Sequence, residues 1–142
     1  MIKEFVKAWD ANKANLQEYF ETHEMREYSE YKDLVRALFE IVINPYIKKR
    51  YGYTYDIDCI EELDHGDYQG TKIFWLHVDR YQPCAKDYVS THNDYGSCSG
   101  CDTLMGIQCY CDGLPTEVQV SEHMTLCLHL LQRCVKPFDL EL

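Results

Sequence analysis

Two cysteines, Cys98 and Cys101, form the only Cys-x-x-Cys pair in the chain of 142 residues. Two intervening residues allow one turn of backbone to present both thiolates to a single metal ion, and Gly100 gives the backbone freedom to make that turn. Zn²⁺ prefers a tetrahedron of cysteine sulfur and histidine nitrogen atoms. The spacing therefore predicts a zinc site at this pair.

The remaining zinc ligands are less tightly constrained by the sequence. Cys109 and Cys111 follow closely, but an intervening helix would separate Cys101 from Cys109 by about 12 Å along its axis. His129 is an alternative because histidine is the commonest metal-binding side chain, although a single histidine on a helix is more often a packed core residue. The predicted zinc ligands are drawn from Cys98, Cys101, His129, Cys109 and Cys111.

Two other chemistries compete with structural zinc. A Cys-x-x-Cys pair between a strand and a helix can act as a redox dithiol, but two long predicted helices precede this pair, unlike the usual βαβ context of such motifs. A zinc hydrolase or deaminase needs a general base and an open coordination position, and the sequence contains neither His-x-Glu nor His-Glu-x-x-His. Asp94 and Asp102 could serve as bases, while Asp102 fits equally well as the N-cap of the following helix.

Apolar residues at helical spacing predict four helices. The second is expected to end at Asn44–Pro45, because the residue before a proline is disfavoured in the α region. The predicted ranges are 2–20, 29–43, 103–108 and 117–135. The expected core stripe of the last helix is Met124, Leu128, Leu131 and Val135.

Alternation of apolar and polar residues predicts three strands, over 53–60, 71–78 and 86–93. Turn-forming residues between the first two indicate a loop over 61–70. Ile73, Trp75 and His77 should share one face of the second strand, where His77 is expected to serve packing. Short connections favour an antiparallel meander. We therefore expect a single α+β domain over 1–142, a three-stranded antiparallel sheet with two N-terminal helices and C-terminal helices packed on it.

The chain is acidic, with 24 Asp and Glu against 14 Lys and Arg, a net charge of −10. Such a charge disfavours direct binding to nucleic acid, which needs Lys and Arg contacts to phosphate, and favours a basic protein partner. Six carboxylates fall close together: Asp56, Asp58, Glu61, Glu62, Asp64 and Asp67. They form either a solvated strand edge and loop or a negatively charged face that competes for a basic groove.

No apolar run approaches the roughly 20 residues of a membrane-spanning helix. The N-terminal residues lack the continuous apolar segment of a signal peptide. We therefore expect a cytoplasmic location, in which eight cysteines are ligands or buried thiols rather than disulfides.

Several short segments resemble small phage and prophage proteins. They are Asp67–Thr71, Tyr81–Pro83, Tyr95–Leu104 and Met124–Arg133. Some small acidic phage proteins are anti-CRISPR inhibitors, which bind a host effector nuclease and block its access to DNA, and this chain is similar to them in kind. Together with the acidity, the absent catalytic motifs and the zinc site predicted from the Cys-x-x-Cys spacing, the resemblance favours a phage-encoded, zinc-containing inhibitor of a host nuclease, with a type II CRISPR effector as the specific expectation. The alternatives are a zinc- or thiol-dependent enzyme and a phage structural or scaffolding protein.

Overall fold

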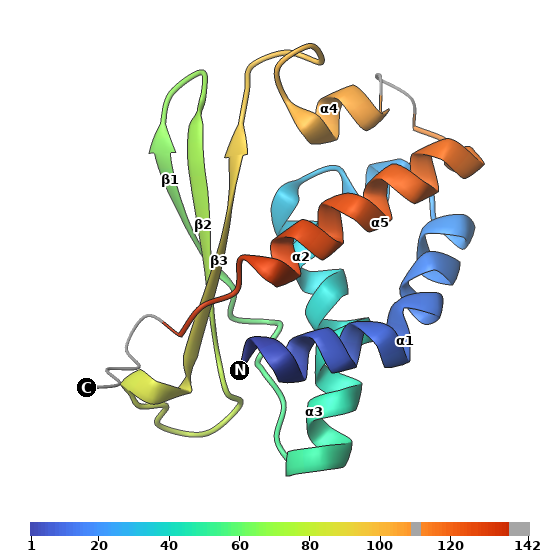
Figure 1. Ribbon diagram of the computed structural model, residues 1–142. Coiled ribbons are helices and arrows are strands. Elements are labelled where there is room, and N and C mark those ends of the chain that lie inside the picture. Colours follow the sequence, from blue (N-terminus) through green and yellow to red (C-terminus); the bar gives the residue numbers. More distant parts are fainter. Residues whose placement is uncertain (109–111, 137–142) are drawn as a thin grey trace.

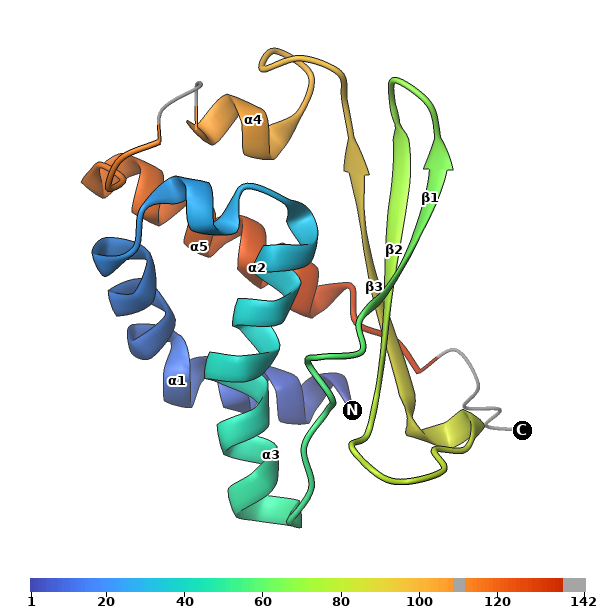
Figure 2. The same ribbon diagram turned by 180° about the vertical axis from the view of Figure 1, so that it is seen from behind.

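The computed structural model describes residues 1–108 and 112–136, in which helices lie against one side of a three-stranded sheet (Figures 1 and 2). The predicted α+β class is confirmed: N-terminal helices precede an antiparallel sheet, and a C-terminal helix packs on the first helix. Within these residues, no helix is long and apolar enough to cross a membrane.

Helices and strands follow one another in the order helices, strands, helices. They are α1 (Ile2–Thr22), the 3₁₀ turn η1 (Met25–Tyr28), α2 (Tyr31–Ala37), the π-helical segment η2 (Leu38–Ile43), α3 (Asn44–Tyr51), β1 (Glu61–Gly66), β2 (Gly70–His77), the 3₁₀ turn η3 (Ala85–Asp87), β3 (Tyr88–Tyr95), α4 (Thr103–Gln108) and α5 (Glu117–Gln132).

The predicted helix end at Asn44–Pro45 is wrong, because α2 continues through η2 into α3. The amide of Asn44 donates to the carbonyl of Phe39, five residues earlier, so the helix is wider here than an α-helix. A proline ring normally clashes with the carbonyl four residues before it. The widened turn accommodates Pro45 within the first turn of α3, and the helix ends instead at Gly52, which has a positive φ of 83°.

The first strand also differs from the prediction. Residues 53–60 are irregular and contribute only one bridge, from Tyr55 to Val78, whereas the strand β1 lies where a loop was expected. Tyr55 is buried because its ring packs edge-on against Phe5 and Phe39, so the alternation reflects helix contacts. The sequence of β1 shows no alternation of apolar and polar residues, so the strand is identified only by its pairing with β2.

The sheet has the order β1-β2-β3, and both pairs are antiparallel. Phe74 and Leu76 of β2 are fully buried towards the helices, while Ile73 and Trp75, which share the other face, are half-buried. The Thr91 hydroxyl of β3 donates to a carbonyl of α5 at 2.6 Å, which fastens the C-terminal helix to the sheet.

The core stripe predicted for α5 is partly wrong. Met124 and Leu128 are only half-buried and Val135 is exposed, although Leu131 is buried as expected. The buried side of the helix includes His123, which has no exposed surface. The stripe is displaced because α5 packs against α1 as well as against β3.

Candidate functional site

The Cys-x-x-Cys pair occupies the loop that joins β3 to α4, residues 96–102 (Figure 1). The Sγ atoms of Cys98 and Cys101 lie 3.0 Å apart, and both side chains are exposed. The amides of Cys101 and Asp102 both donate to the Cys98 carbonyl, at 3.1 and 2.8 Å. The backbone thus makes the tight turn that the spacing predicts.

Asp102 is buried under this loop and fixes its position. One carboxylate oxygen accepts hydrogen bonds from the Met105 amide at 2.9 Å and from the Tyr31 hydroxyl at 3.0 Å, and the other accepts from the Gly96 amide at 3.0 Å. The Tyr31 hydroxyl accepts in turn from the Leu104 amide at 3.2 Å. Asp102 therefore caps α4, which is the structural one of its two predicted roles.

The hydrogen bonds of this loop favour ionisation of the Cys101 thiol. Hydrogen bonds from the Cys98 side chain and backbone lower the pKa of the Cys101 thiol below its ordinary value, because they stabilise the thiolate. Two thiolates on a tetrahedral zinc ion lie about 3.8 Å apart, given a Zn–S distance of about 2.3 Å. The observed separation of 3.0 Å would have to widen slightly for a shared metal ion.

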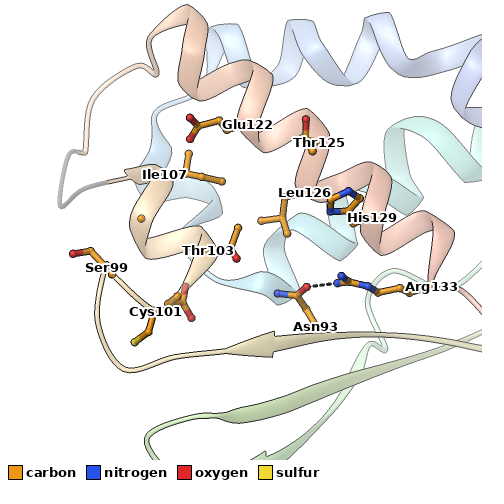
Figure 3. Close-up of a pocket in the computed structure, with 13 residues that line it drawn as sticks. Asn93, Ser99, Cys101, Thr103, Ile107, Glu122, Thr125, Leu126, His129 and Arg133 are labelled. Carbon is orange, nitrogen blue, oxygen red and sulfur yellow. Dashed lines mark hydrogen bonds between the residues drawn. The ribbon is translucent and has the colours of Figure 1, made fainter.

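A cavity of about 500 Å³ lies between this loop, α4 and α5 (Figure 3). Its lining includes Cys101, Asp102, His129 and Arg133. Arg133 donates to the side-chain oxygen of Asn93 and so ties α5 to the end of β3. The cavity therefore places a thiol with a lowered pKa, an imidazole and a guanidinium on one solvent-accessible surface.

The predicted zinc ligands are only partly brought together. His129 is exposed and lies across the cavity from Cys101 in Figure 3. Over residues 1–108 and 112–136, no third histidine, cysteine or carboxylate clusters with the two thiols at metal-binding distances. Cys109 and Cys111 lie outside the described residues. Ligation of zinc by Cys98 and Cys101 with any of these partners stays a prediction.

The other cysteines of the described chain have different environments. Cys127 and Cys134 are buried between α5 and its neighbours, and burial raises the pKa of the Cys134 thiol to about 12 and that of Cys127 further still. Cys84 is exposed, and its Sγ atom lies 3.3 Å from a carboxylate oxygen of Asp87. The buried thiols are therefore inert at neutral pH.

The acidic cluster falls largely on one projecting element, which we call the acidic hairpin: residues 61–70, comprising β1 and the turn into β2. All residues from 61 to 69 are exposed. Gly66 makes the turn with a φ of 153°, and a Cβ there would lie 2.3 Å from the Gln69 carbonyl oxygen, so only glycine fits. The hairpin stands clear of the helices in Figure 1.

One further group of ligand-type side chains was missed by the sequence reasoning. Asp56, Cys59 and His77 lie near the opposite end of β2, each with one ligand atom within 4.8 Å of the others. The Asp-x-x-Cys spacing of the first two was a weak local signal. The approach of His77, 18 residues after Cys59, follows only from the pairing of Tyr55 with Val78.

No known protein family, curated protein or solved structure matches the chain.

Proposed function

We propose that the protein is a zinc-containing inhibitor of the anti-CRISPR type, encoded by a phage, which binds a basic host nuclease and blocks its access to DNA. The observation that carries the proposal is the acidic hairpin. Its strand is exposed at every position and carries three carboxylates in six residues, with a fourth in the turn. A negatively charged, projecting element of this kind is complementary to a groove that normally holds DNA or RNA.

Most charges of the acidic hairpin are available to a partner. Glu62 is its only carboxylate with an ion pair in the described part of the chain, to Lys72 at 3.9 Å. Asp64 accepts a hydrogen bond from the Tyr95 hydroxyl at 2.5 Å but has no ion pair in the described part of the chain. Glu61 and Asp67 face solvent. Unpaired carboxylates raise the association rate with a basic surface and make it sensitive to salt.

The position of the strand adds a second means of recognition. β1 is an edge of the sheet, so one side of its backbone is unpaired by strands of the described chain. Pairing of this edge with β1 of a second protein molecule is disfavoured, because it would place carboxylates of the two strands opposite one another. A basic extended segment of a partner would instead gain both backbone hydrogen bonds and charge neutralisation.

The proposed zinc has a structural task in this arrangement. The Cys-x-x-Cys loop and the hairpin turn lie at the same end of the sheet, since Gly70 pairs with Tyr95 next to the loop. The Tyr95 hydroxyl donates a hydrogen bond to the Asp64 carboxylate at that end. A metal held by Cys98 and Cys101 would stiffen the loop that supports the hairpin.

Binding to a purified type II CRISPR effector nuclease tests the proposal. Glu61→Lys with Asp67→Lys should weaken binding by at least about tenfold at low salt and relieve inhibition of DNA cleavage. The matched control is Glu18→Lys with Glu21→Lys, which makes the same charge change at exposed positions of α1 and should leave binding within about twofold. The protein alone should not shift DNA in a gel.

Equal loss of binding in both double variants would show that only net charge matters and would contradict a role for the acidic hairpin. If neither this nuclease nor any nucleic-acid enzyme from a host lysate is retained at low salt, the inhibitor proposal fails.

A second candidate function, a zinc- or thiol-dependent enzyme, is favoured by the exposed thiol pair beside the cavity of Figure 3. The lowered pKa of Cys101 suits a nucleophilic or redox role. Reduction of a model disulfide, in which the Cys98–Cys101 pair is itself oxidised to a disulfide, would favour this function over inhibition if it is abolished by Cys98→Ser and unaffected by Glu61→Lys with Asp67→Lys.

A further inference from the structure

We infer that Asp56, Cys59 and His77 form a second metal site, suited to Zn²⁺ and independent of the Cys-x-x-Cys loop. One ligand atom from each residue lies within 4.8 Å of the other two. Ligands of a tetrahedral zinc ion lie about 3.3–3.8 Å apart, given metal–ligand distances of about 2.0–2.3 Å. Small rotations of exposed or half-buried side chains close this difference.

A hydrogen bond holds one ring nitrogen of His77 and leaves the other available as a ligand. Its Nδ1 atom lies 2.9 Å from the Val78 carbonyl oxygen. A carbonyl only accepts hydrogen bonds, so Nδ1 carries the proton and the Nε2 lone pair is left for a metal. Histidines that bind metals in proteins usually donate their other ring N–H to a carbonyl or carboxylate in this way, which fixes both tautomer and ring orientation.

The backbone holds Asp56 and His77 together without a metal. The Asp56 amide donates to the His77 carbonyl at 2.8 Å, and the Asp79 amide donates to the Thr54 carbonyl at 2.8 Å. The bridge between Tyr55 and Val78 lies between these bonds. Two of the three ligands are therefore brought together by the fold, which lowers the entropic cost of binding an ion.

The carboxylate of Asp56 is also held in place. One of its oxygen atoms accepts a hydrogen bond from the Asp58 amide at 2.9 Å. This bond closes a turn immediately before Cys59. The other oxygen is left to face an ion. Cys59 is exposed, so its thiolate can rotate onto the metal without disturbing the core.

The donor set selects the class of metal. Thiolate and imidazole favour zinc and its transition-metal neighbours over Mg²⁺ and Ca²⁺, which prefer oxygen ligands alone. Three protein ligands leave the fourth corner of a zinc tetrahedron for water or for a donor atom of a partner molecule. The partial exposure of all three side chains keeps that position accessible.

The site is distinct from the Cys-x-x-Cys loop because the two lie at opposite ends of the sheet. His77 pairs with Tyr88 at one end of β2, and Gly70 pairs with Tyr95 at the other. A single zinc ion cannot bridge them. The full chain is therefore expected to bind one more equivalent of metal than the Cys-x-x-Cys loop accounts for.

Titration of metal-free protein with Co²⁺ and with Zn²⁺ tests the inference, in a Cys98→Ser/Cys101→Ser background that removes the other thiol pair. We expect one equivalent of Co²⁺ to give a thiolate charge-transfer band, and Zn²⁺ to displace it. Adding Cys59→Ser or His77→Gln should each weaken binding more than about 100-fold, beyond the usual loss of an outer-shell partner. Cys84→Ser, which removes an exposed thiol elsewhere, should change the affinity less than about threefold.

Thermal unfolding of the same proteins provides a second readout. Zn²⁺ should raise the melting temperature of the background protein, because ligand binding stabilises the native state. The shift should disappear in Cys59→Ser, a surface substitution that leaves the core intact. An absent thiolate band in the background protein, or a band that survives both Cys59→Ser and His77→Gln, would overturn the inference.

Discussion

The hydroxyl of Tyr31, on α2, lies 3.0 Å from a carboxylate oxygen of Asp102, 71 residues later in the chain. Both groups are buried, and burial raises the pKa of Tyr31 to about 12. The hydroxyl donates to Asp102 and accepts from the Leu104 amide, so it satisfies two polar groups at the start of α4. Through this pair, the N-terminal helices hold the Cys-x-x-Cys loop in place.

Tyr31→Phe is therefore expected to lower the free energy of unfolding by about 1–3 kcal/mol, because it leaves the Leu104 amide and one bond of Asp102 unsatisfied. Urea denaturation measures the change. Tyr46→Phe is the matched control, since the Tyr46 hydroxyl bonds to Glu4 in a less buried setting, and it should cost under about 1 kcal/mol. Equal costs for the two variants would show that the Tyr31–Asp102 bond does not anchor the loop.

Gly96 should be irreplaceable at the base of the same loop. A Cβ on Gly96 would lie 2.6 Å from both the carbonyl oxygen and the Sγ atom of Cys101. Gly96→Ala is expected to lower stability by about 1–3 kcal/mol, as overpacking does. It should also alter the thiol reactivity of Cys101. Gly113→Ala meets no atom within 4 Å and should be neutral or slightly stabilising by the same denaturation measurement.

Burial of His123 should make the protein sensitive to acid. Its ring stacks on Phe20 at 5.3 Å and meets Tyr28 edge-on at 5.0 Å, and neither ring nitrogen has a hydrogen-bond partner in the described structure. Burial lowers the pKa of His123 to about 4, and the nearby Gln119 carbonyl, outside hydrogen-bonding geometry, offsets only part of this shift. Below pH ~6.5 His123 binds a proton in the unfolded chain but stays neutral in the native state. The free energy of unfolding therefore falls as the pH drops from about 6.5 to about 4.

The loss attributable to His123 is on the order of 2–3 kcal/mol at pH 4. His123→Leu removes the titrating group at similar volume, and the stability of this variant relative to the native protein should rise as the pH falls. His65→Gln, at an exposed position of β1, provides the control and should show no such trend. A constant difference between pH 7 and pH 4 for His123→Leu would contradict the assigned burial effect.

The sequence predicted the helices better than the strands, for physical reasons. The 3.6-residue period of α1 reflects one face that packs on a core, whereas β1 is exposed on both faces and leaves no pattern. The Cys-x-x-Cys turn is a local feature and could be read directly. The approach of His77 to Asp56 depends on pairing between distant segments, and the burial of His123 depends on α5 packing against α1. Neither has a local signature.

The reactivity of the thiols offers a last test of the Cys-x-x-Cys loop. Because a hydrogen bond from Cys98 is the main cause of the lowered pKa of Cys101, Cys101 should be the first cysteine of the described chain to react with iodoacetamide near pH 7 in chelator-treated protein. Cys127 and Cys134 should stay unmodified until the protein unfolds, because both are buried with raised pKa values. Mass spectrometry of proteolytic peptides gives the rate at each site.

Cys98→Ala removes the hydrogen-bond donor and should slow alkylation of Cys101 several-fold at pH 7. The difference in alkylation rate between the two proteins should vanish at high pH, where Cys101 is fully ionised in both. Cys84→Ala removes an exposed thiol outside the loop and should leave the rate at Cys101 unchanged. If Cys98→Ala reacts at Cys101 as fast as the native protein across this pH range, then exposure alone governs the reactivity of Cys101, and the paired thiols do not activate one another.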